Sequence, residues 1–160
     1  MKHYIVVDTN VIVSSFLAFQ KENKQTPPFI VLANIFSPKS EATVLYNDEI
    51  LKEYKEVLSR PAFKISKSRI GKFINDFKKI AVCINNLPEI NNTKEFPVPK
   101  DIVFYKVTLS RKPSFLVTGN ISHFPAKPFV ITPSEYLEIL SGRKIEEIRK
   151  SKSDNDTQGY

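Results

Sequence analysis

The sequence of 160 residues has one cysteine, two histidines and no long apolar run. The single cysteine, Cys83, excludes an intrachain disulfide, and its apolar neighbours predict a small buried side chain. So few thiols and imidazoles argue against a zinc site built from them. Without 18 or more consecutive apolar residues, no membrane-spanning helix is expected. The short apolar run near the N-terminus ends at Asp8 without a cleavage site, so we expect no signal peptide and a cytoplasmic protein.

An excess of basic residues is the second feature of the composition. Lysine and arginine number 24 against 17 acidic residues, which gives a formal net charge of +7. This charge favours contact with an anionic partner such as nucleic acid, although it also serves solubility. Part of the excess lies near the C-terminus. There we expect a basic and polar tail, partly disordered, over residues 143–160, after a single domain over residues 1–142.

Apolar strands alternate with amphipathic helices along the chain. Strands are predicted at about 3–8, 42–46, 80–84, 114–118 and 129–131, and helices at about 10–20, 27–34, 48–59, 66–79, 98–111 and 133–140. The first strand has a continuous apolar run, which is typical of a strand covered on both faces. This order predicts an α/β fold in which helices cover both faces of a parallel sheet through right-handed crossovers.

Two polar residues follow predicted strands directly. Asp8 ends the first strand, and Asn120 follows the fourth in Thr118-Gly119-Asn120. Open α/β sheets bind ligands at the carboxyl ends of their strands, so both side chains can face one crevice. Each also has a structural explanation, because Asp8 can cap the next helix and Gly-Asn is ordinary turn chemistry. His123, three residues later, is expected to be a turn or surface residue.

Two acids on predicted helices can reach the same edge of the sheet. Glu53 lies at the border of the apolar stripe of its helix, while Glu49 and Glu56 point farther out. Asp101 lies in the first turn of a helix that Pro99 opens, where the helix dipole stabilises an acid by ~0.3–1 kcal/mol. Both acids also have a purely structural explanation. Glu53 can belong to a solvated helix face, and Asp101 can be present because the helix dipole stabilises it.

A meeting of Asp8, Glu53 and Asp101 at one edge predicts a metal site. Three carboxylates within a few ångströms repel one another unless they are protonated or neutralised by a cation. Their oxygens suit Mg²⁺ or Mn²⁺, which keep waters and also bind phosphate oxygens. Such an ion activates water and stabilises charge on a phosphate, which is the chemistry needed to cut a phosphodiester.

Four segments carry a resemblance to a known family. They are Ile5 to Val11, Glu49 to Pro61, Pro99 to Tyr105 and Phe115 to Asn120. With the final segment 131–137, their order and spacing over about residues 3–140 resemble the PIN domain family. Within it, the chain is similar to the bacterial branch of toxins from toxin–antitoxin pairs. The resemblance implies a three-layer α/β/α fold and a metal-dependent ribonuclease that acts on single-stranded RNA.

The resemblance also implies roles for single residues. Asp8, Glu53 and Asp101 match the acids that bind Mg²⁺ or Mn²⁺ and are catalytic. Thr9 is expected to support the site with its hydroxyl, and Asn10 stands beside it in the same motif. The partners implied are RNA, an antitoxin protein and a second copy of the chain in a homodimer.

Two residues depart from the family pattern. Val98 stands where many relatives have an aspartate before the proline, and valine is a poor helix cap, so a looser helix start is expected. Asn120 takes a catalytic position often held by a fourth acid. The missing charge weakens the binding of a second metal ion more than that of the first, so we expect one tightly bound ion at most.

Lys100 and Lys106 are expected to contact the RNA backbone.

Two other functions remain open from the sequence. A basic α/β domain with a damaged site, which Val98 and Asn120 permit, can hold RNA or a protein without cutting. A phosphatase of the haloacid dehalogenase type also begins with an aspartate at a strand end. That chemistry usually has a second acid two residues later, where this chain has Asn10.

Overall fold

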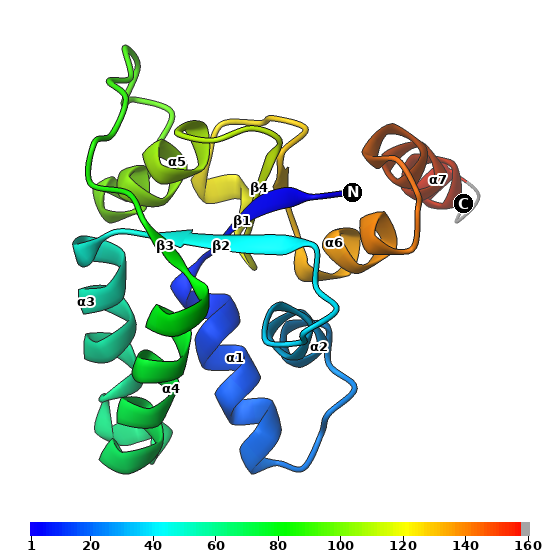
Figure 1. Ribbon diagram of the computed structural model, residues 1–160. Coiled ribbons are helices and arrows are strands. Elements are labelled where there is room, and N and C mark those ends of the chain that lie inside the picture. The colour runs from blue at the N-terminus through cyan, green and yellow to red at the C-terminus, as the bar shows by residue number, and fades with distance from the viewer. Residues whose placement is uncertain (158–160) are drawn as a thin grey trace.

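A parallel sheet forms the centre of the computed structural model, which describes residues 1–157 (Figure 1). The strands of these residues are β1 (His3–Val7), β2 (Ala42–Tyr46), β3 (Val82–Cys83), β4 (Ser114–Val117) and β5 (Val130–Ile131). They lie in the order β3-β2-β1-β4-β5, and each neighbouring pair is parallel. The predicted α/β fold with a central parallel sheet of about five strands is confirmed.

Helices cover both faces of this sheet. One side carries α1 (Thr9–Gln20), α2 (Pro27–Ile35), α3 (Asp48–Leu58) and α4 (Lys67–Ile80), and the other carries α5 (Ile102–Leu109) (Figure 1). The three-layer α/β/α arrangement is therefore confirmed. α6 (Pro133–Leu140) packs against α2, and α7 (Ile145–Thr157) follows it. Within residues 1–157, no helix combines the length and apolar character that crossing a bilayer requires.

Local capping signals determine where several helices begin. The Asn47 side chain accepts a hydrogen bond from the Ile50 N–H at the start of α3, and Ser66 caps the start of α4 in the same way. Thr132 and Glu135 form a reciprocal capping box at the start of α6. Such caps stabilise a helix by about 1 kcal/mol each. The sequence prediction therefore places these helix starts within one or two residues of the structure.

The hydrophobic core lies on both faces of β1 and fixes α3 against its end. Ile5, Val6 and Val7 are completely buried, as is Tyr54 of α3. The Tyr54 hydroxyl donates a hydrogen bond to the Val7 carbonyl, and its ring meets Phe77 edge to face. This bond ties α3 to the last residue of β1. As a result, Glu53 lies beside the strand end that carries Asp8.

Cys83 differs from the prediction of a small buried side chain, because the structure leaves it exposed. It belongs to β3, a two-residue strand at the edge of the sheet, where Val82 is 42% exposed as well. An edge strand has a neighbour on one side only, so apolar residues there are covered less completely than in a central strand.

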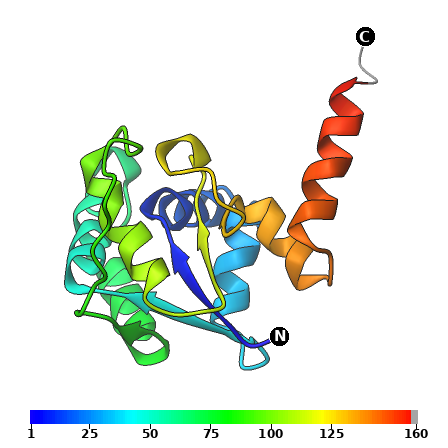
Figure 2. The ribbon, with the colours of Figure 1, turned by 90° about the horizontal axis from the view of Figure 1, so that it is seen from above.

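The C-terminal segment, for which a partly disordered tail is expected, contains a helix. α7 forms a helix that extends away from the body of the molecule (Figure 2). Ile148 is completely buried, and Arg149 donates a hydrogen bond of 2.9 Å to the Val130 carbonyl. Arg149 also lies 3.4 Å from the carboxylate of Glu135 in α6. The residues that bind Arg149 belong to β5 and α6. The polar composition of α7 therefore does not predict these contacts.

The proposed division into a domain of residues 1–142 and a tail of residues 143–160 stays a prediction. The docked residues of α7 make its first two turns part of the folded body. Residues 158–160 of the expected tail lie outside the described part of the chain.

We expect Ile148→Ala to lower the free energy of unfolding by about 2 kcal/mol, because truncation of a buried isoleucine leaves a cavity. Ile121 is 44% exposed and provides a matched control, so Ile121→Ala is expected to change the free energy of unfolding by less than ~0.5 kcal/mol. Urea unfolding curves of the three proteins measure the difference. Equal midpoints for Ile148→Ala and the wild type would show that α7 is not docked.

Candidate functional site

Asp8 stands at the carboxyl end of β1, directly before α1. Its Oδ1 accepts a 2.8 Å hydrogen bond from the Thr9 N–H, so the carboxylate caps α1. Its Oδ2 accepts one of 2.8 Å from the Thr118 hydroxyl and one of 3.3 Å from the Asn10 side-chain amide. The residue is 5% exposed. The capping role and the position at the sheet edge therefore occur together, although the sequence presents them as alternatives.

Thr118 and Asn10 join the ends of β1 and β4. The buried Thr118 hydroxyl accepts a hydrogen bond from the Asn120 N–H at 2.9 Å while it donates to Asp8. The Asn10 side-chain oxygen accepts from the Gly119 N–H at 2.9 Å. A Cβ on Gly119 would lie 3.2 Å from that oxygen, so this approach favours glycine. Sequence reasoning missed Thr118; its hydroxyl before Gly-Asn at a strand end was the available signal.

Glu53 reaches the same edge from α3. Its carboxylate accepts a hydrogen bond from the Thr9 hydroxyl, and the side chain is half-buried. The next residue, Tyr54, holds the helix against β1. Glu53 is therefore turned toward Asp8 by the packing of its own neighbour.

Asp101 reaches the edge from the 3-10 turn η2 (Pro99–Asp101), which precedes α5. The Asp101 carboxylate is mostly buried and lies 3.1 Å from Nδ1 of His123. Val98 offers no capping bond, and the helix begins as a 3-10 turn. His123 lies in the turn η3 (Ile121–His123), half-buried and against Asp101. Sequence reasoning expected a turn there and missed this contact, because no local pattern pairs the two residues.

These side chains meet around one hollow of about 350 Å³. Its lining includes every residue predicted to be catalytic or supporting, namely Asp8, Thr9, Asn10, Glu53, Asp101 and Asn120. His123 and Val98 also line it. Lys100 lines an adjoining hollow together with Glu53, whereas Lys106 lines neither. The structure therefore brings the predicted acids to one place, and their catalytic role stays a prediction.

The electrostatics of the hollow favour a cation. The pKa of Asp8 is raised to about 6, because burial, together with the charges of Asp101 and Glu53, outweighs the opposing hydrogen bonds from Thr118 and Thr9. Burial also raises the pKa of Asp101, while His123 opposes that rise. The negative charge of these acids is therefore only partly offset by the surrounding donors.

The acids do not form a ready-made metal cage. Among residues 1–157, no three His, Cys, Asp or Glu side chains are grouped so that they could hold a metal ion. This corrects the expectation that three carboxylates meet within a few ångströms. Each carboxylate instead has its own hydrogen-bond partner, namely Thr118 for Asp8, Thr9 for Glu53 and His123 for Asp101.

The donor chemistry nevertheless fits a single Mg²⁺ or Mn²⁺ ion. Mg²⁺ is usually bound through one or two carboxylates and keeps several waters, so it does not require three protein acids. The carboxylates of Asp8, Glu53 and Asp101 supply oxygen ligands of the right type around the hollow. The negative charges of Asp101 and Glu53 repel the ionised carboxylate of Asp8 and so raise its pKa. The same negative charges attract a cation.

Comparison with known proteins identifies one family. The family model described as PIN domain matches residues 4–122, which is more than half of the chain and includes all of the predicted site residues. No curated protein and no solved structure matches the chain. The match favours this family over the phosphatase alternative. That alternative usually has a second acid at the position where this chain has Asn10.

The stability of the metal-free protein is expected to fall as the pH rises from about 4 to about 6. The folded-state pKa of Asp8, about 6, lies above the ordinary value of 3.8, so the folded state keeps a proton that the unfolded state releases. The contribution of this proton is complete below pH 4 and is lost through pH 6. A shift of this size corresponds to roughly 3 kcal/mol.

Urea unfolding in EDTA at pH 4, 5, 6 and 7 measures this slope. Asp8→Asn cannot ionise, so its profile is expected to be flatter over this window. Asp76 of α4 is half-buried, and the Lys72 hydrogen bond lowers its pKa, so Asp76 cannot cause a fall in stability as the pH rises and Asp76→Asn should keep that fall. Parallel profiles for the wild type and Asp8→Asn would exclude a raised pKa at Asp8.

Proposed function

Because the chain belongs to the PIN domain family, whose members are generally metal-dependent nucleases, we propose that it is an Mg²⁺- or Mn²⁺-dependent endonuclease of single-stranded RNA. One observation carries the proposal within this molecule. Asp8, Glu53 and Asp101 face a single hollow at the carboxyl edge of the sheet, where their mutual charge contributes to the raised pKa of Asp8. The net charge of +7 suits a polyanionic substrate.

The protein contributes ligands and orientation to this reaction. When bound, the divalent ion supplies the charge that activates water and stabilises the phosphate. Asp8 and Asp101 would hold the ion, and Glu53 would either hold it or orient the attacking water and accept its proton. Asn120, at the rim of the hollow, positions a water ligand. These roles need one ion and no fourth acid.

The neighbouring donors keep the acids in place without using all of their oxygen lone pairs. An ionised carboxylate has about four lone-pair sites. Asp8 uses three of them for Thr9, Thr118 and Asn10, which leaves one for a cation. The Thr9 hydroxyl occupies one oxygen of Glu53 and leaves the other available.

The proposal extends to a biological role as the toxin of a type II toxin–antitoxin pair in the cytoplasm. Its support is the resemblance to the bacterial toxin branch and the general association of PIN domains with such pairs. The partners would be an antitoxin protein and a second copy of the chain. A small open reading frame beside the gene, whose product copurifies with this chain, would support the pairing.

An RNA- or protein-binding module is the second candidate. The observation that favours it is that every acid of the site already has a hydrogen bond within the protein, without a ready-made metal cage among residues 1–157. Such a module binds RNA and leaves it intact.

With a labelled single-stranded oligoribonucleotide, Mg²⁺ or Mn²⁺ is expected to start cleavage and EDTA to stop it. Asp8→Asn is expected to reduce the rate by more than the ~100-fold that loss of a supporting residue can cost, because a direct ligand is removed. Asp76→Asn, the same substitution on the surface of α4, is expected to cleave at the wild-type rate. Fragments are resolved by gel electrophoresis.

Intact RNA after incubation of the wild type with either ion would contradict the nuclease proposal. If the wild type and Asp8→Asn then bind the oligonucleotide equally, the binding module is the correct function. If cleavage persists in Asp8→Asn, Asp8 is not a ligand of the catalytic ion.

A further inference from the structure

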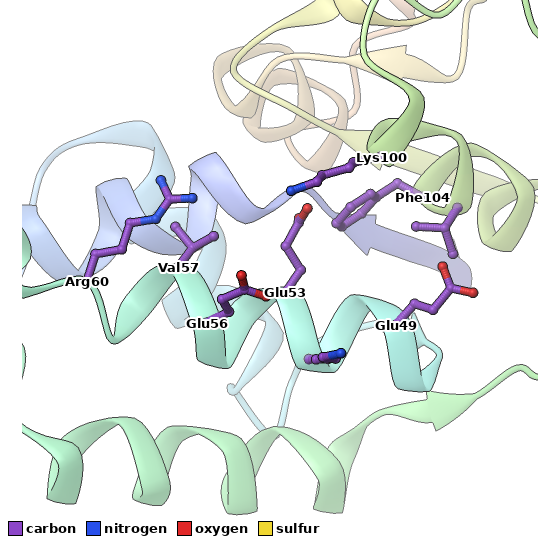
Figure 3. Close-up of a pocket in the computed structure, with 9 residues that line it drawn as sticks. Glu49, Glu53, Glu56, Val57, Arg60, Lys100 and Phe104 are labelled. Carbon is purple, nitrogen blue, oxygen red and sulfur yellow. The ribbon is translucent and has the colours of Figure 1, made fainter.

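A second hollow adjoins the first and shares two of its lining residues, Glu53 and Val57. It has a volume of about 270 Å³ and lies between α3 and the segment formed by η2 and α5. Val103 and Phe104 contribute apolar walls. Figure 3 shows Lys100 and Glu53 extending toward one another across this hollow, with Arg60 at the end near Val57. Glu53 therefore stands between the two hollows.

Three cations line the second hollow, namely Lys52, Arg60 and Lys100, and the side chains of Lys100 and Arg60 are not engaged elsewhere. Within residues 1–157, neither side chain makes an ion pair or a hydrogen bond to another side chain. Both residues are exposed. Glu49 and Glu56 also line this hollow, so a small free anion is opposed there by acids as well as attracted by the three cations.

The local backbone explains why Lys100 and Asp101 serve different hollows. The two residues are consecutive in the 3-10 turn η2, where successive side chains point about a third of a turn apart. Asp101 lines the first hollow and Lys100 the second. A cation is thus fixed next to a candidate ligand acid by the turn that both share.

Arg60 is placed by the end of α3 in a comparable way. It follows the C-cap residue Ser59 and precedes the 3-10 turn η1 (Pro61–Phe63). Arg60 lines the second hollow, and Phe63 at the end of η1 lines the first. The chain after α3 therefore borders both hollows, as η2 does.

We propose that the second hollow is a phosphate subsite, in which Lys100 and Arg60 bind the RNA backbone beside the phosphate that lies at Asp8 and Asp101. The RNA strand then passes over Glu53 from one hollow into the other. Arginine binds phosphate oxygens in a bidentate fork and lysine binds them as a point charge, so the two cations suit a phosphodiester. The subsite deepens the proposed function and rests on it.

Binding is measured with a fluorescent single-stranded oligoribonucleotide and the full chain, by anisotropy in EDTA at increasing salt. Lys100→Ala and Arg60→Ala are each expected to weaken binding about fivefold or more. The slope of log affinity against log salt is expected to fall by ~0.7 for each phosphate of the single strand that a variant no longer neutralises. Lys100→Arg keeps the charge and is expected to restore both quantities.

Lys39→Ala is the matched control, because Lys39 is exposed and precedes β2, at the sheet edge opposite the site. It is expected to leave the affinity and the salt slope unchanged. The subsite is overturned if the wild type does not bind the oligonucleotide, or if Lys100→Ala and Arg60→Ala behave like Lys39→Ala.

A parallel cleavage assay with Mg²⁺ separates this inference from the proposed function. If the wild type binds through Lys100 and Arg60 but never cleaves, the subsite stands and the nuclease proposal fails. If the wild type cleaves and both variants retain its KM and salt slope, the nuclease proposal stands and the subsite fails. A raised KM with little change in kcat for both variants supports the subsite.

Discussion

The hydrogen bond from the Thr118 hydroxyl to Asp8 joins two residues that lie 110 positions apart in the chain, and the candidate site is built around it. The parallel pairing of β1 with β4 makes this bond possible, because it sets Val7 opposite Val117 and so brings the next residues of each strand together. A slip of one residue would turn each side chain to the other face of the sheet. The register of two central strands therefore determines which polar groups can share the hollow.

The buried acids of this hollow lower the stability of the fold, although the proposed activity requires them. Burial and neighbouring acids raise the pKa of Asp8, so its ionised form costs folding free energy near neutral pH. Hydrogen bonds from Thr9 and Thr118 lower that cost without removing it. A divalent cation would stabilise the same carboxylates that otherwise repel one another. Binding of that cation would then also stabilise the fold.

Neighbouring residues divide the work of structure and function at two places. In α3, Tyr54 fixes the helix to the Val7 carbonyl, and Glu53 faces the two hollows. In η2, Asp101 lines one hollow and Lys100 the other. In both places, a functional side chain is positioned by the helix or turn that its neighbour shares. The proposed path of the RNA strand follows from this arrangement, because the cations border the acids without pairing with them.

The sequence alone determined the α/β class, the order of the strands and helices as far as α6, and the acids that reach the sheet edge. Apolar runs, helical periodicity and caps such as Asn47 act over a few residues, so they are visible without a structure. Tertiary structure decided which donors the acids meet, because these bonds span long separations: 44 residues from Thr9 to Glu53 and 22 from Asp101 to His123. It also exposed Cys83 and docked α7 through Ile148, since burial depends on packing between distant segments and not on local pattern.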